Sequence, residues 1–123
     1  MRALAFWALL LTPALLLAQP SFPTTFAADA APLSPEALRE RLAGKTYFFK
    51  PVVGDAVRIQ YQETTVYANV GNASDTGKWR VEGSTVCVEW RKFPSSCTEA
   101  RLIGDALYMK RASTGEVVML MPK

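Results

Sequence analysis

The stretch Gly77–Cys97, GKWRVEGSTVCVEWRKFPSSC, decides the fold that we expect for this chain. Apolar and polar side chains alternate in its middle part, over 85–90, which is the pattern of a β-strand with one buried face. The Glu-Gly pair at 82–83 predicts a tight turn before this strand, and Pro94 lies in a loop after it. The stretch therefore predicts two β-hairpins that share a central strand.

The two cysteines of this stretch predict a disulfide. If Cys87 lies opposite Cys97 on neighbouring strands, then Val88 faces Ser96, and the register suits a hairpin. A redox pair or a metal site is the alternative, but redox motifs usually have C-x-x-C spacing and zinc sites usually have four ligands. We expect the bond on the opposite sheet face from Trp90, which we place in the main core near the other tryptophan of the stretch. A disulfide favours an oxidising compartment.

The beginning of the chain predicts a secretory signal peptide. Arg2 precedes an apolar run over 3–17, which is shorter than the about 20 residues of a membrane-spanning helix. The small residues Thr25 and Ala27 favour cleavage after Ala27, with Ala30 as the second choice and an uncleaved anchor as the alternative. We therefore expect a signal peptide at 1–27, a flexible lead-in at 28–33 and a single domain at 34–123, located in the periplasm or secreted, without a stable membrane anchor.

One short helix and about eight short strands are predicted in the domain. Ser34 as N-cap, Pro35 at the first helical position and Gly44 after the last turn predict a helix over 35–43. Its apolar stripe, Leu38 and Leu42, is wide enough to dock on a sheet or a barrel end. A period of two then predicts strands at 46–50, 56–62, 64–70, 78–81, 85–90, 96–103, 106–111 and 116–121, with a turn cluster at 71–76. The pattern predicts an all-β fold, a small antiparallel barrel or half-open sandwich with one capping helix.

Several short motifs carry a family resemblance. They are LAGKT at 42–46, GKW at 77–79, CVEW at 87–90, and Cys97 followed by a Gly-Asp turn at 104–105. In these motifs the chain resembles the uncharacterised exported proteobacterial proteins of domain of unknown function family 995, over roughly 38–120. The resemblance implies a bacterial periplasmic setting. Because the family has no established activity, it implies no functional residues.

The composition argues against catalysis. The 123 residues include no histidine, which removes Ser-His-Asp and Cys-His machinery and the usual general base near neutral pH. The 14 Lys and Arg residues are scattered, without the basic stripe and recognisable module that nucleic-acid binding needs. Met109, Met119 and Met121 have thioethers that suit Cu(I), but filling core space or covering an edge is the simpler interpretation. We expect no enzyme, no cofactor, no metal site and no nucleic-acid partner.

Aromatic side chains are the candidates for a ligand site at a barrel mouth or on a sheet face. They are Tyr61, Tyr67, Trp79, Trp90 and Tyr108. The competing interpretation is that they build the core. The predicted function is a non-enzymatic periplasmic binding or interaction module for a protein, an envelope component or a small apolar ligand. The alternative is a structural or stress-related envelope protein without a small-molecule site, and an enzyme of unknown class is third.

Overall fold

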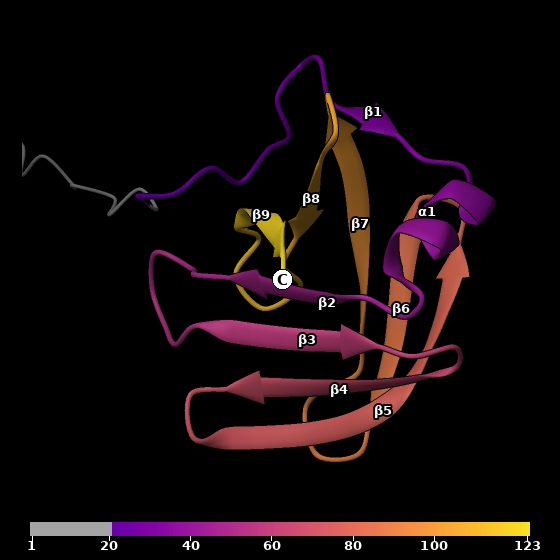
Figure 1. The fold of residues 1–123 in the computed structure, drawn as a ribbon. Helices are drawn as coiled ribbons and strands as arrows, with labels where there is room; N and C mark the ends of the chain where they lie inside the picture. Colours follow the sequence, from indigo (N-terminus) through magenta and orange to yellow (C-terminus); the bar gives the residue numbers. More distant parts are fainter. Residues whose placement is uncertain (1–20) are drawn as a thin grey trace, which may run out of the picture.

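The computed structural model describes residues 21–123 and is a closed antiparallel β-barrel with one short helix (Figure 1). Residues 1–20, which carry most of the predicted signal peptide, lie outside the described residues. Strands β2 to β9 follow one another around the ring in chain order, and β9 pairs with β2 to close it. The elements are β1 (Ala31–Pro32), α1 (Pro35–Leu42), β2 (Thr46–Phe49), β3 (Val57–Tyr61), β4 (Thr65–Val70), β5 (Ala73–Glu82), β6 (Thr85–Trp90), β7 (Ser96–Ile103), β8 (Ala106–Lys110) and β9 (Val117–Pro122). The all-β prediction is confirmed, and of its two forms the protein adopts the barrel.

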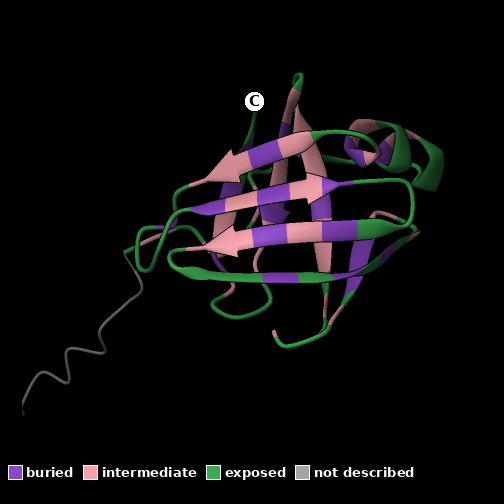
Figure 2. Ribbon diagram, turned by 60° about the horizontal axis from the view of Figure 1, so that its bottom comes forward, coloured by how far each residue is buried: buried purple, intermediate pink, exposed green. Residues whose placement is uncertain are grey.

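Alternation along each strand gives the barrel an apolar interior. On β3, for example, the side chains at 57, 59 and 61 are buried and those between them are half-buried, a banding visible along the strands in Figure 2. The buried core cluster occupies the interior with Leu33, Leu38, Leu42, Tyr47, Ile59, Tyr61, Val66, Ala68, Trp79, Val86, Val88, Ala100, Leu107, Met109, Val118 and Leu120. Side chains from every barrel strand belong to this one cluster.

Helix α1 covers the barrel beside the C-terminal part of β5. It begins as predicted, because the Ser34 hydroxyl accepts a hydrogen bond from the backbone N–H of Ala37 at 3.2 Å. Leu38 and Leu42 are fully buried and belong to the core cluster, which confirms the predicted docking stripe. No helix in residues 21–123 has the length and apolar character needed to cross a bilayer.

The largest difference from the predicted strands is at the start of β5. The turn cluster predicted over 71–76 is wrong, because the turn needs only 71–72, where Gly71 has a φ of 58°. The polar run that follows pairs with β4, with Thr76 opposite Tyr67. Ser74 and Thr76 point to solvent, whereas Asp75 between them is buried. The polar composition of 73–76 therefore did not predict a strand. A strand is nevertheless stable here, because the carboxylate of Asp75, which points inward, accepts hydrogen bonds from backbone N–H groups.

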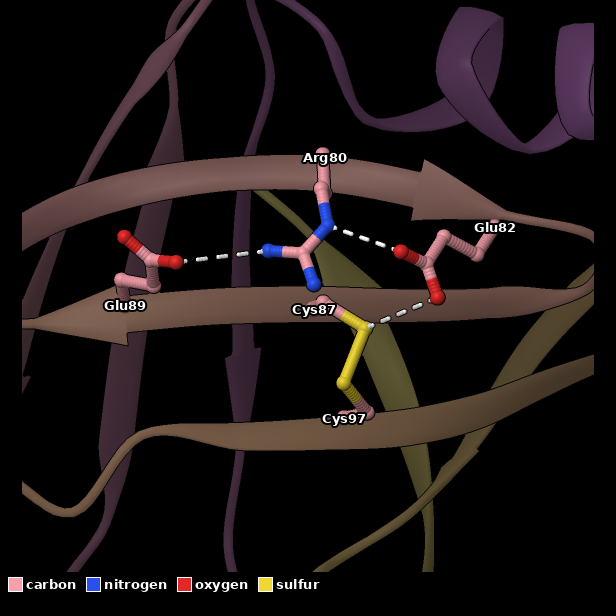
Figure 3. A network of polar contacts seen from close by, with 5 residues as sticks. All are labelled: Arg80, Glu82, Cys87, Glu89 and Cys97. Carbon is pink, nitrogen blue, oxygen red and sulfur yellow. Dashed lines mark hydrogen bonds and ion pairs between the residues drawn. A yellow bond between two sulfur atoms is a disulfide. The ribbon is translucent and has the colours of Figure 1, made fainter.

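The disulfide between Cys87 and Cys97 joins β6 to β7, as predicted (Figure 3). The two residues are directly opposite each other and Val88 is opposite Ser96, so the predicted register is confirmed. The Cα atoms of the cysteines are 4.0 Å apart. Because Val88 belongs to the core, period-two geometry puts the neighbouring cysteine on the outer face of the sheet. Cys97 is exposed, and Cys87 is covered by its neighbours.

The segment predicted as a flexible lead-in takes part in the sheet. Within 28–33, strand β1 pairs with β7, placing Ala31 opposite Leu102. Leu33 is buried, and its backbone N–H donates to the Ser84 hydroxyl at 3.1 Å. This lead-in is therefore packed against the domain, because its one leucine completes the core.

The residues before the lead-in also contact the barrel. The carbonyl of Pro23 accepts a hydrogen bond from the N–H of Val117, at the start of β9, at 2.9 Å. The ring of Phe26 lies 5.0 Å from the guanidinium carbon of Arg101 on β7. Both contacts lie on the N-terminal side of Ala27, the residue after which cleavage is predicted.

Candidate ligand-binding groove

The structure distributes the five aromatic candidates over three places. Tyr61 and Trp79 are buried in the core, in an edge-to-face pair with ring centroids 5.2 Å apart. Tyr67 and Trp90 line one groove on the barrel. Tyr108 is half-buried on β8, where it faces outward because its neighbours 107 and 109 are in the core. Of the five, only Tyr67 and Trp90 come together at a hollow in the surface.

Trp90 is less buried than predicted. It is half-buried and packs against the edge of the core cluster, where its ring meets Phe93 edge to face at 5.7 Å. The residue opposite Trp90 on β5 is Gly77, which has no side chain to cover the indole. The expectation that Trp90 belongs to the main core beside Trp79 is therefore corrected to a position at the core margin.

A groove of about 750 Å³ lies over strands β3 to β6. A second hollow of about 420 Å³ adjoins it and shares Tyr67, Thr76 and Arg91. The larger hollow is lined by Gln60, Gln62, Thr65, Val66, Tyr67, Thr76, Gly77, Lys78, Glu89, Trp90 and Arg91, and the smaller one by Tyr67, Ser74, Asp75, Thr76, Arg91 and Lys92. Most of these side chains are polar and belong to the outward set of their strands, which places the groove on the outside of the barrel.

Strand register arranges the outward side chains of the groove in two rows. In the first row, Gln60, Tyr67 and Thr76 stand side by side on β3, β4 and β5. In the second row, Thr65, Lys78 and Glu89 stand side by side on β4, β5 and β6. Side chains directly opposite on one face of antiparallel strands lie about 5 Å apart at Cβ. The rows therefore form a continuous floor of hydroxyl, amide and charged groups.

Gly77 lines the groove on β5, between the outward residues Thr76 and Lys78. A Cβ atom built on Gly77 would collide with the backbone carbonyl of Glu89 on β6. The close approach of the two backbones therefore requires glycine here, between Val66 and Trp90.

Three basic side chains line the groove and the hollow that adjoins it: Lys78, Arg91 and Lys92. In the described part of the chain, none of the three forms an ion pair. The nearby carboxylate of Glu89 is instead directed to Arg80, at 3.6 Å, over the disulfide (Figure 3). The two hollows are therefore lined by three cations and by two carboxylates, Glu89 and Asp75, so positive charge is in excess.

Asp75 is the second acidic group at the groove, and backbone groups occupy it. One carboxylate oxygen accepts hydrogen bonds from the N–H groups of Lys92 at 2.7 Å and Phe93 at 2.9 Å, and the other from Thr76 at 2.8 Å. Burial by itself would raise the pKa of Asp75, but these N–H groups and the charge of Lys92 together lower it. Asp75 thus holds the β6–β7 loop that presents Arg91 and Lys92.

Tyr67 lines both hollows. Hydrogen bonds with Ser74 and then Asn69 lower the pKa of Tyr67, with a smaller effect of the Arg58 charge. The Asn69 amide donates to the phenol oxygen at 3.3 Å. These neighbours fix the position of the phenol.

Sequence reasoning did not identify the polar part of this groove. The alternation in the predicted strands showed which polar residues point outward. Only the pairing of the strands shows that Gln60 and Thr76 lie beside Tyr67. The residues described contain no cluster of three or more His, Cys, Asp or Glu side chains that could hold a metal ion. Met109 is buried in the core, whereas Met119 and Met121 are exposed, so these three thioethers do not share one face.

Comparisons with protein-family models, with curated proteins and with solved structures give no match. The resemblance to domain of unknown function family 995 stays a prediction.

Proposed function

We propose that this protein is a non-enzymatic binding module whose outer groove holds an anionic ligand. The observation that carries the proposal is the set of three basic side chains without ion-pair partners, Lys78, Arg91 and Lys92, around a groove of about 750 Å³ and its neighbour. The three cations outnumber the two carboxylates that line the hollows, Glu89 and Asp75, and an excess of one sign of charge raises the local concentration of the opposite charge. The hydroxyl and amide groups of the floor supply the hydrogen bonds that orient a bound molecule.

The barrel interior gives less support to the small apolar ligand considered from the sequence. Large side chains such as Tyr61 and Trp79 occupy it, together with the leucines of α1. Both hollows described here lie on the outside, and their floors are mostly polar. These features favour a polar, water-soluble ligand or an exposed polar part of the envelope.

We place this module outside the cytoplasm. The Cys87–Cys97 disulfide supports an oxidising compartment. The contacts of Pro23 and Phe26 with the barrel favour removal of the signal peptide before Pro23 over the cut after Ala27 predicted from the sequence. Intact-mass measurement of the exported protein distinguishes the two, since the first residue is then at or before Pro23, and a chain that begins after Ala27 would contradict this.

Tripolyphosphate, a small polyanion without sugar or peptide groups, tests the charge requirement by isothermal titration calorimetry. Arg91→Ala with Lys92→Ala should weaken its binding about tenfold at low salt, because two groove charges are lost. The matched control is Lys110→Ala with Arg111→Ala, which removes the same charge from an adjacent basic pair that does not line the groove. Equal losses in both double variants would mean that only net charge attracts the anion, and the proposal would be wrong.

A further inference from the structure

We infer that the anionic ligand is an acidic oligosaccharide, a short chain of sugars that carry carboxylates. This inference rests on the proposed function and specifies its ligand class. It depends on four features of the groove: the distribution of its charges, the chemistry of its uncharged polar side chains, its aromatic surface and the absence of a free strand edge beside it.

The charges are spread along the site. Lys78 lines only the larger hollow, Lys92 only the smaller one, and Arg91 lines both. The two hollows together are far larger than a single phosphate or carboxylate group. A chain with anionic groups at intervals can reach all three cations, whereas a small anion reaches one or two of them.

The uncharged groups between these cations suit sugar hydroxyls. The first row of the floor offers the amide of Gln60, the phenol of Tyr67 and the hydroxyl of Thr76. Amides and hydroxyls both donate and accept, which matches a sugar hydroxyl that does the same. Gln62 and Thr65 extend this set and are already oriented, because the Thr65 hydroxyl donates to the Gln62 amide oxygen at 2.7 Å. Such prior ordering lowers the entropic cost of binding.

Aromatic surface is also available in the groove. Tyr67 and Trp90 both line it and both keep part of their rings accessible. The C–H faces of a sugar ring are apolar and pack on such rings, while its hydroxyls stay on the polar floor.

An acidic peptide fits the site less well. Extended peptides commonly bind by adding a strand to a free sheet edge, where backbone hydrogen bonds supply the affinity. Strands β3 to β6, which form the groove, each have a paired strand on both sides. The barrel therefore leaves a peptide no edge here, and only side chains are available for hydrogen bonding.

The test compares three trimers on the protein purified after export, by calorimetry and by ¹⁵N chemical-shift mapping. The probes are trigalacturonate, its neutral methyl ester and triglutamate, which carries the same number of side-chain carboxylates as the first. We expect trigalacturonate to bind about tenfold tighter than either of the others, with shifts at Tyr67, Thr76 and Arg91. Gln60→Ala should weaken trigalacturonate about fivefold and leave triglutamate unchanged, because only the sugar uses the amide.

The possible outcomes separate this inference from the proposed function. Equal binding of triglutamate and trigalacturonate would show a general anion site, which overturns the sugar assignment and leaves the proposed function in place. Equal binding of the methyl ester and trigalacturonate would show that the carboxylates do not contribute to binding. That result would overturn both the inference and the proposed anion site. Absence of groove shifts with every probe, tripolyphosphate included, would overturn both. Gln60 is an outward residue on the barrel surface, and circular dichroism of Gln60→Ala verifies that the variant is folded.

Discussion

The core beneath α1 and the outer groove both contain a tyrosine and a tryptophan, but these side chains are buried in the core and partly exposed in the groove. Tyr61 is 2 % exposed and packs against Trp79, and burial, followed by the nearby Tyr47, raises the pKa of its phenol. Tyr67, on the neighbouring strand, stands on the outer face, where hydrogen bonds lower its pKa. Register produces this difference, because Tyr61 pairs with Val66 and the very next residue on β4 points outward. One step along a strand therefore separates a core aromatic from a groove aromatic.

The largest effect that sharpens this comparison is expected from Trp79→Ala. Emptying a large core position should lower the free energy of unfolding by about 3–5 kcal/mol. Trp90→Ala should cost clearly less, because the indole is only half-buried at the core margin. Urea denaturation monitored by far-ultraviolet circular dichroism measures both. If Trp90→Ala is the more damaging change, the groove side of the barrel is as tightly packed as the core, and the comparison fails.

Loss of the disulfide should have the next largest effect. Cys87→Ser with Cys97→Ser should destabilise the protein by about 2.5–3 kcal/mol, since the bond closes a short loop in the unfolded chain. The barrel should still form, because the buried cluster lies on the other face of β6. Thermal unfolding of the variant beside the oxidised protein gives the measurement. A variant that is unfolded at room temperature would show that the bond, rather than the core, holds the domain together.

A smaller and pH-dependent effect is expected at Asp75. Its pKa is lower in the folded protein than in the unfolded chain, so its contribution is complete above the unfolded value of about 3.9. That contribution is lost as the pH falls through the folded value. Asp75→Asn should therefore flatten the dependence of stability on pH below about pH 4.

The same substitution should weaken anion binding at neutral pH, because the carboxylate holds the loop of Arg91 and Lys92. Stability measured from pH 2 to 7, together with tripolyphosphate titrations at pH 7, tests both effects. Glu89→Gln is the control, since that carboxylate also lies at the groove but is directed to Arg80. An unchanged acid-stability profile in Asp75→Asn would contradict the assignment of these hydrogen bonds.

The smallest effect on stability is expected from Tyr67→Phe. Removal of a hydroxyl on the outer surface should change the free energy of unfolding by less than about 0.5 kcal/mol. It should also remove an absorbance step that lies below the ordinary tyrosine range near pH 10 in an alkaline titration. Tyr61→Phe should leave that step in place, because burial raises the pKa of Tyr61. If the step remains in Tyr67→Phe, it does not belong to Tyr67, and the lowered pKa of Tyr67 would be contradicted.

Much of the fold could be predicted from local pattern. The alternation through 57–61 and 85–90 predicted strands with one buried face, and the spacing of Cys87 and Cys97 predicted their pairing and register. Ser34 and Pro35 predicted the start of α1. These features depend on neighbours within a few residues or on one hairpin, so the chain carries them without reference to the rest of the molecule.

The candidate site was only partly predictable. Tyr67 and Trp90 were among the aromatic candidates, but nothing local separated them from Tyr61 and Trp79, which have the same residue types. Asp75 was placed in a turn because its neighbours are polar. Its role depends on Lys92 and Phe93, which follow it by 17 and 18 positions.

The sequence by itself determined which residues form strands, which face of each strand is apolar and which cysteines meet, because these depend on short-range periodicity. The tertiary structure alone decided that β9 returns to β2, and that closure fixes which outward side chains stand together. Buried Glu116, for example, accepts the N–H of Val52 at 2.9 Å across 64 positions. Such contacts are set by the closing of the whole barrel, since a polar group taken from water must find its partner wherever the chain places one.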